Sequence, residues 1–159
     1  MNRKVLQLIS LMISSGTKRA NWYRKKKLFG HIGNNVMIQG FKLPLNPELV
    51  YIGDNVNLAS NVTLVTHDVV HYMLNKHEGL DGDFKEKTGK IEIGNNVFVG
   101  ANSVILYDVK IGNNVIIGAN STVTKDLPED SVCVGSPCKR IGSFQDFVNK
   151  RRNKDGESQ

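Results

Sequence analysis

Residues 93–128 read IGNNVF, VGANSV, ILYDVK, IGNNVI, IGANST and VTKDLP when the sequence is written in groups of six. The first position of every group is aliphatic, and the fifth is small or aliphatic. A helix would repeat its apolar residues about every 3.6 positions and a two-sided strand every 2, so a strict period of six matches neither alone. The same frame recurs upstream, as IGNNVM and IQGFKL from Ile32 and as IGDNVN, LASNVT and LVTHDV from Ile52.

This period predicts a coil of short strands joined by bends. In each group, the first side chain would point into the interior and the fifth would tuck inward near the corner. Three groups would form one triangular coil, and stacked coils would pair as parallel strands about 4.8 Å apart. One coil cannot bury its own inner face, so the coils must stack. Asparagine tolerates the left-handed backbone region, and such residues stand at the expected bends: Asn34-Asn35, Asp54-Asn55, Asn95-Asn96 and Asn113-Asn114.

The length of 159 residues, with 40% hydrophobic and 23% charged residues, fits one globular domain. We expect a basic helical cap over residues 1–30, a β-helix over 31–142 with an extruded loop over 68–90, and a short helix with a polar tail over 143–159. The apolar stretch Val5–Ile13 lacks a signal-peptide cleavage site and precedes further basic residues, so we interpret it as helix. Two cysteines are too few for a disulfide framework, which favours a reducing cytoplasm.

The repeat pattern resembles the hexapeptide-repeat acyltransferase superfamily, and most closely its galactoside, maltose and polysaccharide O-acetyltransferases. The resemblance covers about residues 30–142 and rests on NVTLVTH at 61–67, IGNNVFVGANSVI at 93–105 and VTKDLPEDSVCVGSPCKRI at 123–141. It implies a left-handed coil, an exception to the usual right-handed crossover, together with a homotrimer and acetyl-CoA as co-substrate. The predicted fold class is therefore all-β: a left-handed parallel β-helix of hexapeptide repeats with short N- and C-terminal helices.

His67 is the candidate catalytic residue because it stands where the period breaks. The groups of six vanish from Asp68 to Lys90, and a break of this length predicts a functional loop. A histidine at the loop's root is held yet exposed, and its unperturbed pKa near 6.5 suits a general base. In the resembling family, the histidine at this position takes the proton of the acceptor hydroxyl. Neighbours in an extended chain point to opposite faces, so a backbone carbonyl or an acid from the loop is a better candidate than Asp68 for orienting His67.

The resemblance also supplies candidate binding residues. The family binds pantetheine along a groove between subunits, and the small residues of Gly100-Ala101 and Gly118-Ala119 would let that arm lie against the backbone. Phe98 would pack on the arm or fill the subunit contact. Gln39 falls near the place where sugar-acetylating relatives hold an acceptor with an amide. Four residues match the family's nucleotide-end positions: Thr124, Lys125, Lys139 and Arg140.

Metal binding is the alternative for the loop histidines. The γ-class carbonic anhydrases share this fold and bind zinc through three histidines at subunit interfaces. Here His67, His71 and His77 lie within one loop, whereas a catalytic zinc site needs ligands in fixed geometry. The Asp81–Asp83 triplet lacks a full set of calcium ligands. We therefore expect no metal.

Basic residues gather at both ends of the chain, whose net charge is +6. Aromatic residues are not interleaved with them as a stacking platform requires, so we expect no nucleic-acid partner. The basic helix over residues 3–28, with Trp22 and Tyr23, would cap the β-stack or dock on an anionic membrane, and the two roles are compatible. We expect a cytoplasmic protein, with peripheral contact at the inner face of the membrane as the further alternative.

These features together predict an O-acetyltransferase that moves an acetyl group from acetyl-CoA to a sugar hydroxyl by direct attack. The resemblance suggests a precursor of capsule, exopolysaccharide or lipopolysaccharide as the acceptor. The chain has no GxSxG or Cys–His signature of an acyl-enzyme. Two alternatives are acetylation of a small antibiotic or amino-acid hydroxyl and a non-catalytic binding or assembly scaffold. A scaffold would need neither His67 nor the Gly-Ala corners.

Overall fold

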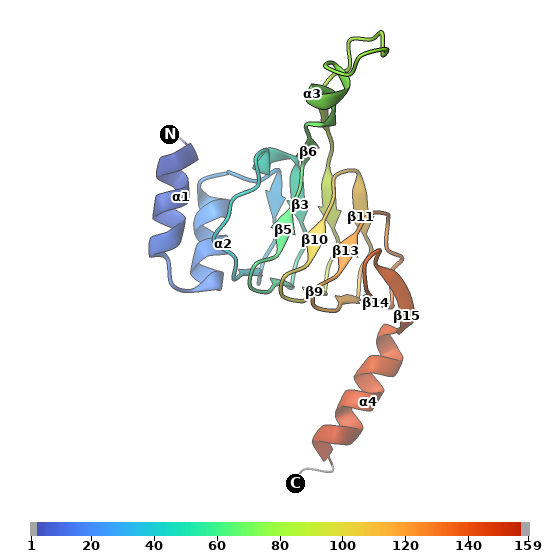
Figure 1. The fold of residues 1–159 in the computed structure, drawn as a ribbon. Coiled ribbons are helices and arrows are strands. Elements are labelled where there is room, and N and C mark those ends of the chain that lie inside the picture. Colours follow the sequence, from blue (N-terminus) through green and yellow to red (C-terminus); the bar gives the residue numbers. More distant parts are fainter. Residues whose placement is uncertain (1–2, 157–159) are drawn as a thin grey trace.

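The groups of six form three flat faces that wind around one axis as a left-handed β-helix (Figure 1). The structure is a computed structural model that describes residues 3–156. The first face contains β1 (His31–Ile32), β3 (Val50–Ile52), β8 (Ile91–Ile93) and β11 (Val109–Ile111). The second contains β2 (Met37–Ile38), β4 (Val56–Leu58), β9 (Val97–Val99), β12 (Val115–Ile117), β14 (Ser131–Val134) and β15 (Lys139–Ser143). The third contains β5 (Thr63–Leu64), β10 (Val104–Ile105) and β13 (Thr122–Val123).

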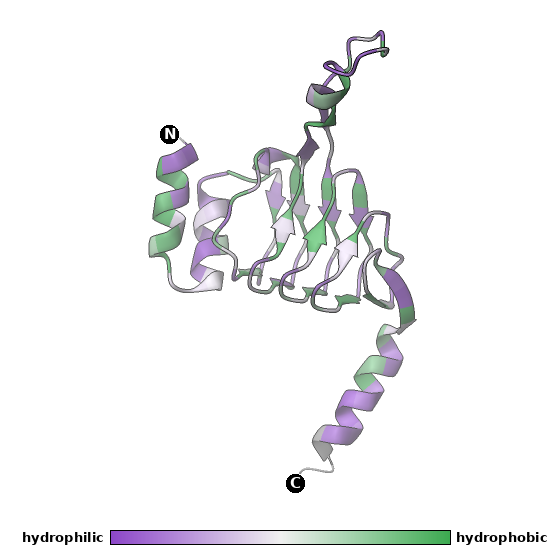
Figure 2. Ribbon diagram, viewed as in Figure 1, coloured by the Kyte–Doolittle hydropathy of each residue, from purple (hydrophilic) through white to green (hydrophobic). Residues whose placement is uncertain are grey.

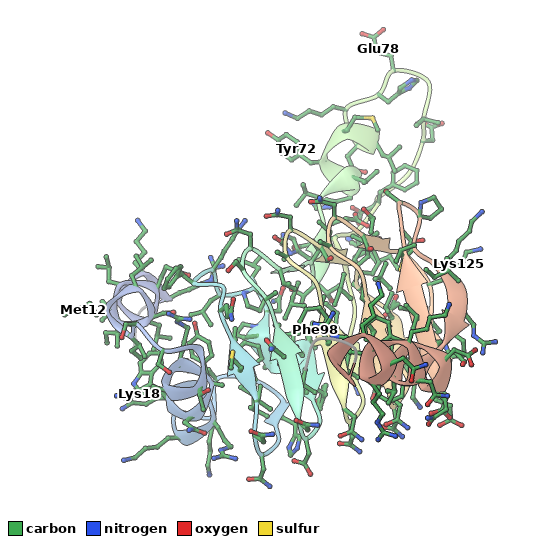
Figure 3. The ribbon with its side chains drawn as sticks, turned by 90° about the horizontal axis from the view of Figure 1, so that it is seen from below. Met12, Lys18, Tyr72, Glu78, Phe98 and Lys125 are labelled. Atoms are coloured by element: carbon green, nitrogen blue, oxygen red, sulfur yellow. The ribbon has the colours of Figure 1, made fainter. Side chains whose placement is uncertain are left out.

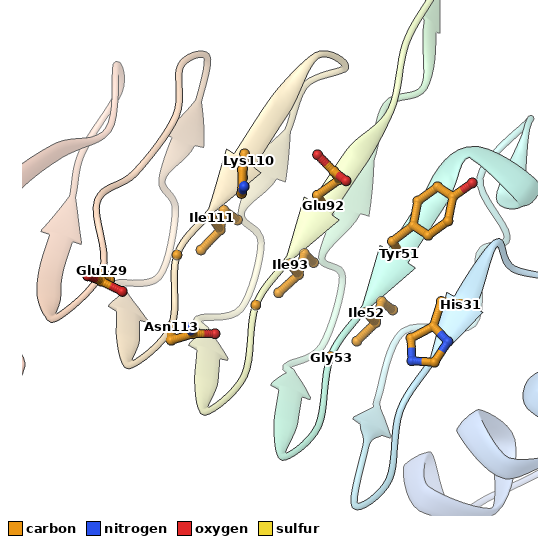
Figure 4. Close-up of a pocket in the computed structure, with 12 residues that line it drawn as sticks. His31, Tyr51, Ile52, Gly53, Glu92, Ile93, Lys110, Ile111, Asn113 and Glu129 are labelled. Carbon is orange, nitrogen blue, oxygen red and sulfur yellow. The ribbon is translucent and has the colours of Figure 1, made fainter.

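The two inward columns predicted from residues 93–128 are buried. All six first positions are 4% exposed or less, and the fifth positions are buried as well. Ile52, Ile93 and Ile111 stand one behind another along the first face (Figure 4). The polar members of the fifth column, Ser103 and Ser121, both donate to the carbonyl oxygen of Gly118, at 3.1 and 2.7 Å. Their hydroxyls therefore enter the core without an unpaired group.

The corners confirm the role assigned to asparagine. The second residue of each pair has a positive φ, for example 56° at Asn96 and 55° at Asn114. The side chains also form a ladder along the prism, because each amide nitrogen donates to the equivalent oxygen one coil further on. Asn55 donates to Asn96 at 2.9 Å and Asn96 donates to Asn114 at 3.0 Å.

The N-terminal end departs from the predicted single helix. Two helices, α1 (Arg3–Met12) and α2 (Gly16–Lys25), are separated by a break at which Ser15 accepts a hydrogen bond from the Lys18 N–H. Arg19 belongs to the sequence's basic cluster but is only 1% exposed. Its guanidinium donates to the carbonyl oxygens of Ile38 and Gln39, at 2.7 and 3.1 Å. Arg19 is thus a structural cation that pins α2 to the first coil.

The frame slips by one residue after Ile38. The fifth position of that group is Lys42, which is exposed, and Leu43 enters the core in its place at 2% exposure. The following chain forms only a 3-10 turn, η1 (Pro47–Leu49), so the third face has no strand in the first coil. The repeat assigned to IQGFKL is therefore wrong beyond its first position.

The C-terminal end also differs from the expectation. Strand pairing in the three faces is parallel except between β14 and β15, which pair antiparallel. After β15, α4 (Phe144–Gly156) extends away from the prism (Figure 1). The sequence suggested a short helix followed by a polar tail, whereas α4 is 13 residues long and its Phe147 is 40% exposed. The antiparallel strand reverses the chain and directs α4 outward.

Candidate active site

His67 lies at the root of a ribbon that leaves the prism. It begins β6 (His67–Asp68), which pairs antiparallel with β7 (Lys87–Thr88), and Thr88 is the partner of His67. Before His67, the N–H of Val65 still donates to Ile105 of the next coil at 2.9 Å. Between β6 and β7 the chain carries α3 (Val70–Leu74) and extends far from the three faces (Figure 1). The imidazole of His67 is therefore attached at the point where the coil ends and the projecting loop begins.

Thr66 fixes the residue before His67. It is fully buried, and its hydroxyl accepts from the Asn46 N–H and donates to the Asn46 side-chain oxygen, both at 3.2 Å. Its carbonyl oxygen accepts the N–H of Gly89 at 3.0 Å, which ties down the returning chain. Sequence reasoning missed Asn46. The coil offset of 20 residues, visible between Ile32 and Ile52, would have placed it beside Thr66.

The imidazole of His67 has one buried and one accessible nitrogen. Nδ1 is buried and has no hydrogen-bond partner among residues 3–156, whereas Nε2 is not among the buried atoms. The backbone carbonyl or loop acid expected to orient the ring is therefore not found within the described part of the chain. Nε2 is therefore the less enclosed of the two ring nitrogens.

Asp68 serves the loop rather than the ring. Its carboxylate accepts a short hydrogen bond from the Tyr107 hydroxyl and one from the Val70 N–H at 3.1 Å. The bond from Tyr107, helped by that from Val70, holds the pKa of Asp68 below its usual range, and the same contact raises the pKa of Tyr107. Tyr107 follows β10 and occupies the next coil above the loop root. An ionised Asp68 thus fastens the loop to the prism.

A small cleft opens beside His67. Its volume is about 200 Å³, below the ~300–1,000 Å³ of most small-molecule sites. Arg3 of α1 holds one wall by donating to the carbonyl oxygens of Leu43 and Pro44, at 2.9 and 3.3 Å. The cleft is lined by Arg3, Lys42, Leu43, Pro44, Leu45, Thr63, Leu64, Val65 and His67. Its cations and carbonyls suit an oxygen-rich acceptor.

The two Gly-Ala corners proposed to bind pantetheine lie in successive coils. The structure gives another reason why glycine occupies them. Gly100 donates its N–H to Ile117 at 2.8 Å, and Ala101 accepts from Asn120 at 2.9 Å. A Cβ added at Gly100 would lie 2.4 Å from the backbone nitrogen of Ala119. At Gly118 it would lie 2.7 Å from a side-chain carbon of the following coil. Close approach of successive coils therefore explains these glycines without a ligand.

The predicted nucleotide-end residues lie toward the C-terminal end of the prism, two of them after the third face and two in β15 of the second face. Thr124 and Lys125 are exposed and follow β13, two coils beyond β5, which corresponds to about 10 Å of strand spacing. Lys139 and Arg140 begin β15 and are exposed. The Cys138 N–H donates to Thr122 at 2.8 Å, which brings the two pairs to one end of the molecule. Lys125 projects into solvent in Figure 3.

Phe98 and Gln39 lie on the second face. Phe98 is central in β9, points outward and is 41% exposed (Figure 3). The exposed Gln39 side chain accepts a hydrogen bond from Ser60 at 3.1 Å and is not among the residues that line the cleft. One chain therefore does not bring Gln39 together with His67.

The other loop histidines are not gathered around His67. His71 is half-buried in α3 with its own Nδ1 unpaired, and His77 is exposed. Across residues 3–156, no three His, Cys, Asp or Glu side chains are grouped as metal ligands. Both cysteines are free, and burial raises the pKa of Cys138 to about 11, so its thiol is protonated at neutral pH. A protonated, half-buried thiol is a poor nucleophile.

A larger groove, of about 410 Å³, runs along the first face (Figure 4). Its outer side chains are one row of register partners, His31, Tyr51, Glu92 and Lys110. It contains none of the predicted site residues. Its mixed charges and cross-strand spacing are those of an ordinary exposed sheet face, so the cleft beside His67 remains the candidate active site.

Comparisons with known proteins agree with the fold. The family described as bacterial transferase hexapeptide (six repeats) matches residues 90–125. Protein CapG of Staphylococcus aureus is 40% identical over 128 residues, which cover 79% of this chain and 72% of CapG. Galactoside O-acetyltransferase of Escherichia coli (strain K12) is 42% identical over 117 residues, 73% of this chain and 55% of that enzyme. The solved structure of a galactoside acetyltransferase in complex with coenzyme A is 29% identical with a TM-score of 0.70, and the match covers 92% of this chain and 80% of that one. The chain belongs to the hexapeptide-repeat acetyltransferase family, as the repeat pattern predicted.

Proposed function

We propose that this acetyltransferase transfers an acetyl group from acetyl-CoA to a sugar hydroxyl, with His67 as general base. That the chain is an acetyl-CoA-dependent acetyltransferase follows from its family. The sugar acceptor is supported by relatives named for galactoside acetylation and by the cations and carbonyls of the cleft. One observation carries the assignment of His67: at the root of the loop, Nδ1 is buried and Nε2 remains accessible.

The proposed reaction is a direct transfer. His67 Nε2 accepts the proton of the acceptor hydroxyl while the hydroxyl oxygen attacks the thioester carbonyl carbon. The carbon–sulfur bond then breaks, and the imidazolium returns its proton to the departing thiolate. No acyl-enzyme is needed, which agrees with the protonated state of Cys138. The cradle of Thr66 and Asn46 holds the backbone beside the ring, so that Nε2 keeps one direction.

The binding residues follow from the same proposal. Acetyl-CoA would lie along the third face, with its phosphates near Lys125, Lys139 and Arg140 and its thioester near His67. The distance of about two coils between these groups is compatible with an extended pantetheine arm. The cleft of one chain is small, which supports the expectation that a homotrimer completes the site. Sedimentation of the purified protein should give three times the monomer mass.

The decisive test compares His67→Ala with His71→Ala, which removes a half-buried histidine from the same loop. Thiol release from acetyl-CoA is measured with a panel of acceptor sugars, one antibiotic and one hydroxyl amino acid. We expect His67→Ala to lower kcat by about 10²–10⁴ with unchanged acetyl-CoA binding, and His71→Ala to stay near wild type. Near-normal turnover of His67→Ala rejects the general base. If the protein binds no acetyl-CoA, it is instead a scaffold. If thiol is released only with the antibiotic or the amino acid, the acceptor is not a sugar.

A further inference from the structure

The outermost helix carries apolar side chains that the described part of the chain leaves open. Val5, Leu8, Leu11 and Met12 of α1 are 43, 62, 52 and 86% exposed. Positions 5, 8 and 12 share one side of a helix. Figure 2 colours much of α1 as hydrophobic. In Figure 3, Met12 lies at the outer edge of the N-terminal helices, on the side away from the prism. We call this side the outer face of α1.

The opposite side of α1 is bound tightly to the protein. Ser10 is fully buried and shares a hydrogen bond of 2.5 Å with the Tyr23 hydroxyl. The Gln7 side chain accepts from the Leu43 N–H at 2.9 Å and donates to the carbonyl oxygen of Phe41. These contacts fix the rotation of the helix, so the outer face points away from the prism as a preformed surface.

The charge around this helix has one sign. Residues 1–47 contain nine Lys and Arg and no Asp or Glu. The remaining residues, 48–159, therefore hold 21 − 9 = 12 cations and all 15 acids, a balance of −3. The whole net charge of +6 is thus due to the N-terminal segment, 9 − 3 = 6. A partner for this end of the molecule should be anionic.

We propose that the outer face of α1 docks on an anionic lipid bilayer. An apolar stripe with flanking cations suits a helix that lies in the plane of the interface, and each Lys or Arg near such a surface adds to the attraction. No helix within residues 3–156 is long and apolar enough to cross a membrane, so the contact is peripheral. A nucleic acid would use the cations but would gain nothing from Leu8 and Met12.

The docked surface continues into the cleft of the candidate active site. Arg3 and Lys42 line both the cleft with His67 and the open surface beside Leu8. An acceptor held at the bilayer would therefore approach His67 along α1. This last step rests on the proposed function, whereas bilayer docking itself does not depend on catalysis.

Co-sedimentation of the full chain with vesicles tests the docking. Vesicles of phosphatidylcholine alone are compared with vesicles containing about 30 mol% phosphatidylglycerol, at about 0.1 M and about 0.5 M salt. We expect at least about tenfold more binding to the anionic vesicles at low salt, and most of it lost at high salt. Equal binding to both vesicle types, or none to either, overturns the proposal.

A matched pair of variants locates the contact. Leu8→Glu with Met12→Glu places two acids on the outer face, and Ile141→Glu with Phe147→Glu places two on exposed apolar positions at the other end. The first should bind anionic vesicles at least about tenfold less, while the second should keep most of the binding. Acetyl transfer to a soluble acceptor should be unchanged in the first variant, which separates failed docking from failed catalysis or folding. Equal loss in both pairs contradicts docking through α1.

A fluorescence reporter distinguishes insertion from adsorption by charge alone. Trp22 is the single tryptophan of the chain, so Trp22→Phe with Met12→Trp moves the only indole to the outer face. Its emission should shift to the blue with anionic vesicles and stay unshifted with phosphatidylcholine vesicles. Vesicle binding without a shift would mean attachment through cations elsewhere, and the proposal would then be wrong.

Discussion

A single methyl group added at Gly100 tests why glycine stands at the corners of the coil. The φ of Gly100 is not in the left-handed region, so alanine meets no backbone penalty, only a steric one. Its Cβ would lie 2.4 Å from the nitrogen of Ala119 and 2.7 Å from the carbonyl carbon of Gly118. Both are backbone atoms fixed by the ladder, in which the Gly100 N–H bonds Ile117 at 2.8 Å. Overpacking costs about 1–3 kcal/mol, and because no flexible side chain can yield, we expect about 3 kcal/mol.

The assay is urea unfolding of Gly100→Ala beside Gly142→Ala. A Cβ at Gly142 meets nothing within 4 Å, so that variant should match wild type or gain about 0.4–1 kcal/mol. Gly100→Ala should lower the urea midpoint at unchanged slope, which marks a loss of stability alone. The reasoning is refuted if Gly100→Ala unfolds with wild-type stability while its KM for acetyl-CoA rises. The glycine would then serve the ligand, as the sequence resemblance suggested.

Three other perturbations examine the loop root and the thiol. Thr66→Val removes two part-buried hydrogen bonds without changing the shape of the side chain, so it should cost about 1–3 kcal/mol by thermal unfolding and lower kcat more than KM. Thr122→Val, whose hydroxyl makes no such bonds within residues 3–156, should leave both stability and kcat unchanged. Because the pKa of Asp68 is lowered in the folded protein, its contact with Tyr107 stabilises the fold above the pKa of the unfolded state and is lost as pH falls through the pKa of the folded state. Tyr107→Phe should raise the pKa of Asp68 in the folded protein. The loop should then open at a higher pH on acidification, as measured by hydrogen exchange. With its pKa raised to about 11, Cys138 should resist iodoacetamide at pH 7 in the folded protein and react quickly once unfolded, and rapid alkylation of the native protein would contradict this.

The repeats were predictable because the same pattern of residue types recurs in each group of six. An aliphatic first position and a small or aliphatic fifth position recur in all six groups from Ile93, an asparagine corner recurs in four of them, and all the inward positions are buried. Segments outside the repeats occur only once, so no recurring pattern indicates their structure. The slip from Lys42 to Leu43 and the antiparallel β15 each depend on tertiary contacts, whereas the break between α1 and α2 is marked by a single local cap at Ser15. Arg19 illustrates the point, because its burial follows from carbonyls that only the folded first coil presents.

His67 could be proposed from the sequence because the strict period breaks after it and because the resembling family has a histidine at this position. Its supports could not be read from nearby residues, since Asn46 and Tyr107 lie 20 and 39 positions from the residues that they bind. The coil offset of 20 residues would have located Asn46, whereas the offset of 41 between β5 and β10 places Tyr107 opposite Thr66 and not opposite Asp68. The ring's orientation remained open for another reason: Nδ1 finds no partner within residues 3–156, so no pattern in the described chain could have supplied one.

The repeat also determines where specificity can reside. Stacking uses the first and fifth positions, and the close approach of coils uses the corner glycines, so these positions are not free to vary with the substrate. One wall of the cleft comes instead from non-repeating chain, namely α1 and residues 42–45, and the other comes from the coil at residues 63–65. The extruded segment 68–90 begins at the same histidine. Exchanging residues 41–49 or 68–90 with those of a related enzyme should therefore change the acceptor while leaving the unfolding free energy of the prism nearly constant. A transplant that altered stability but not acceptor preference would place the specificity on the coil itself.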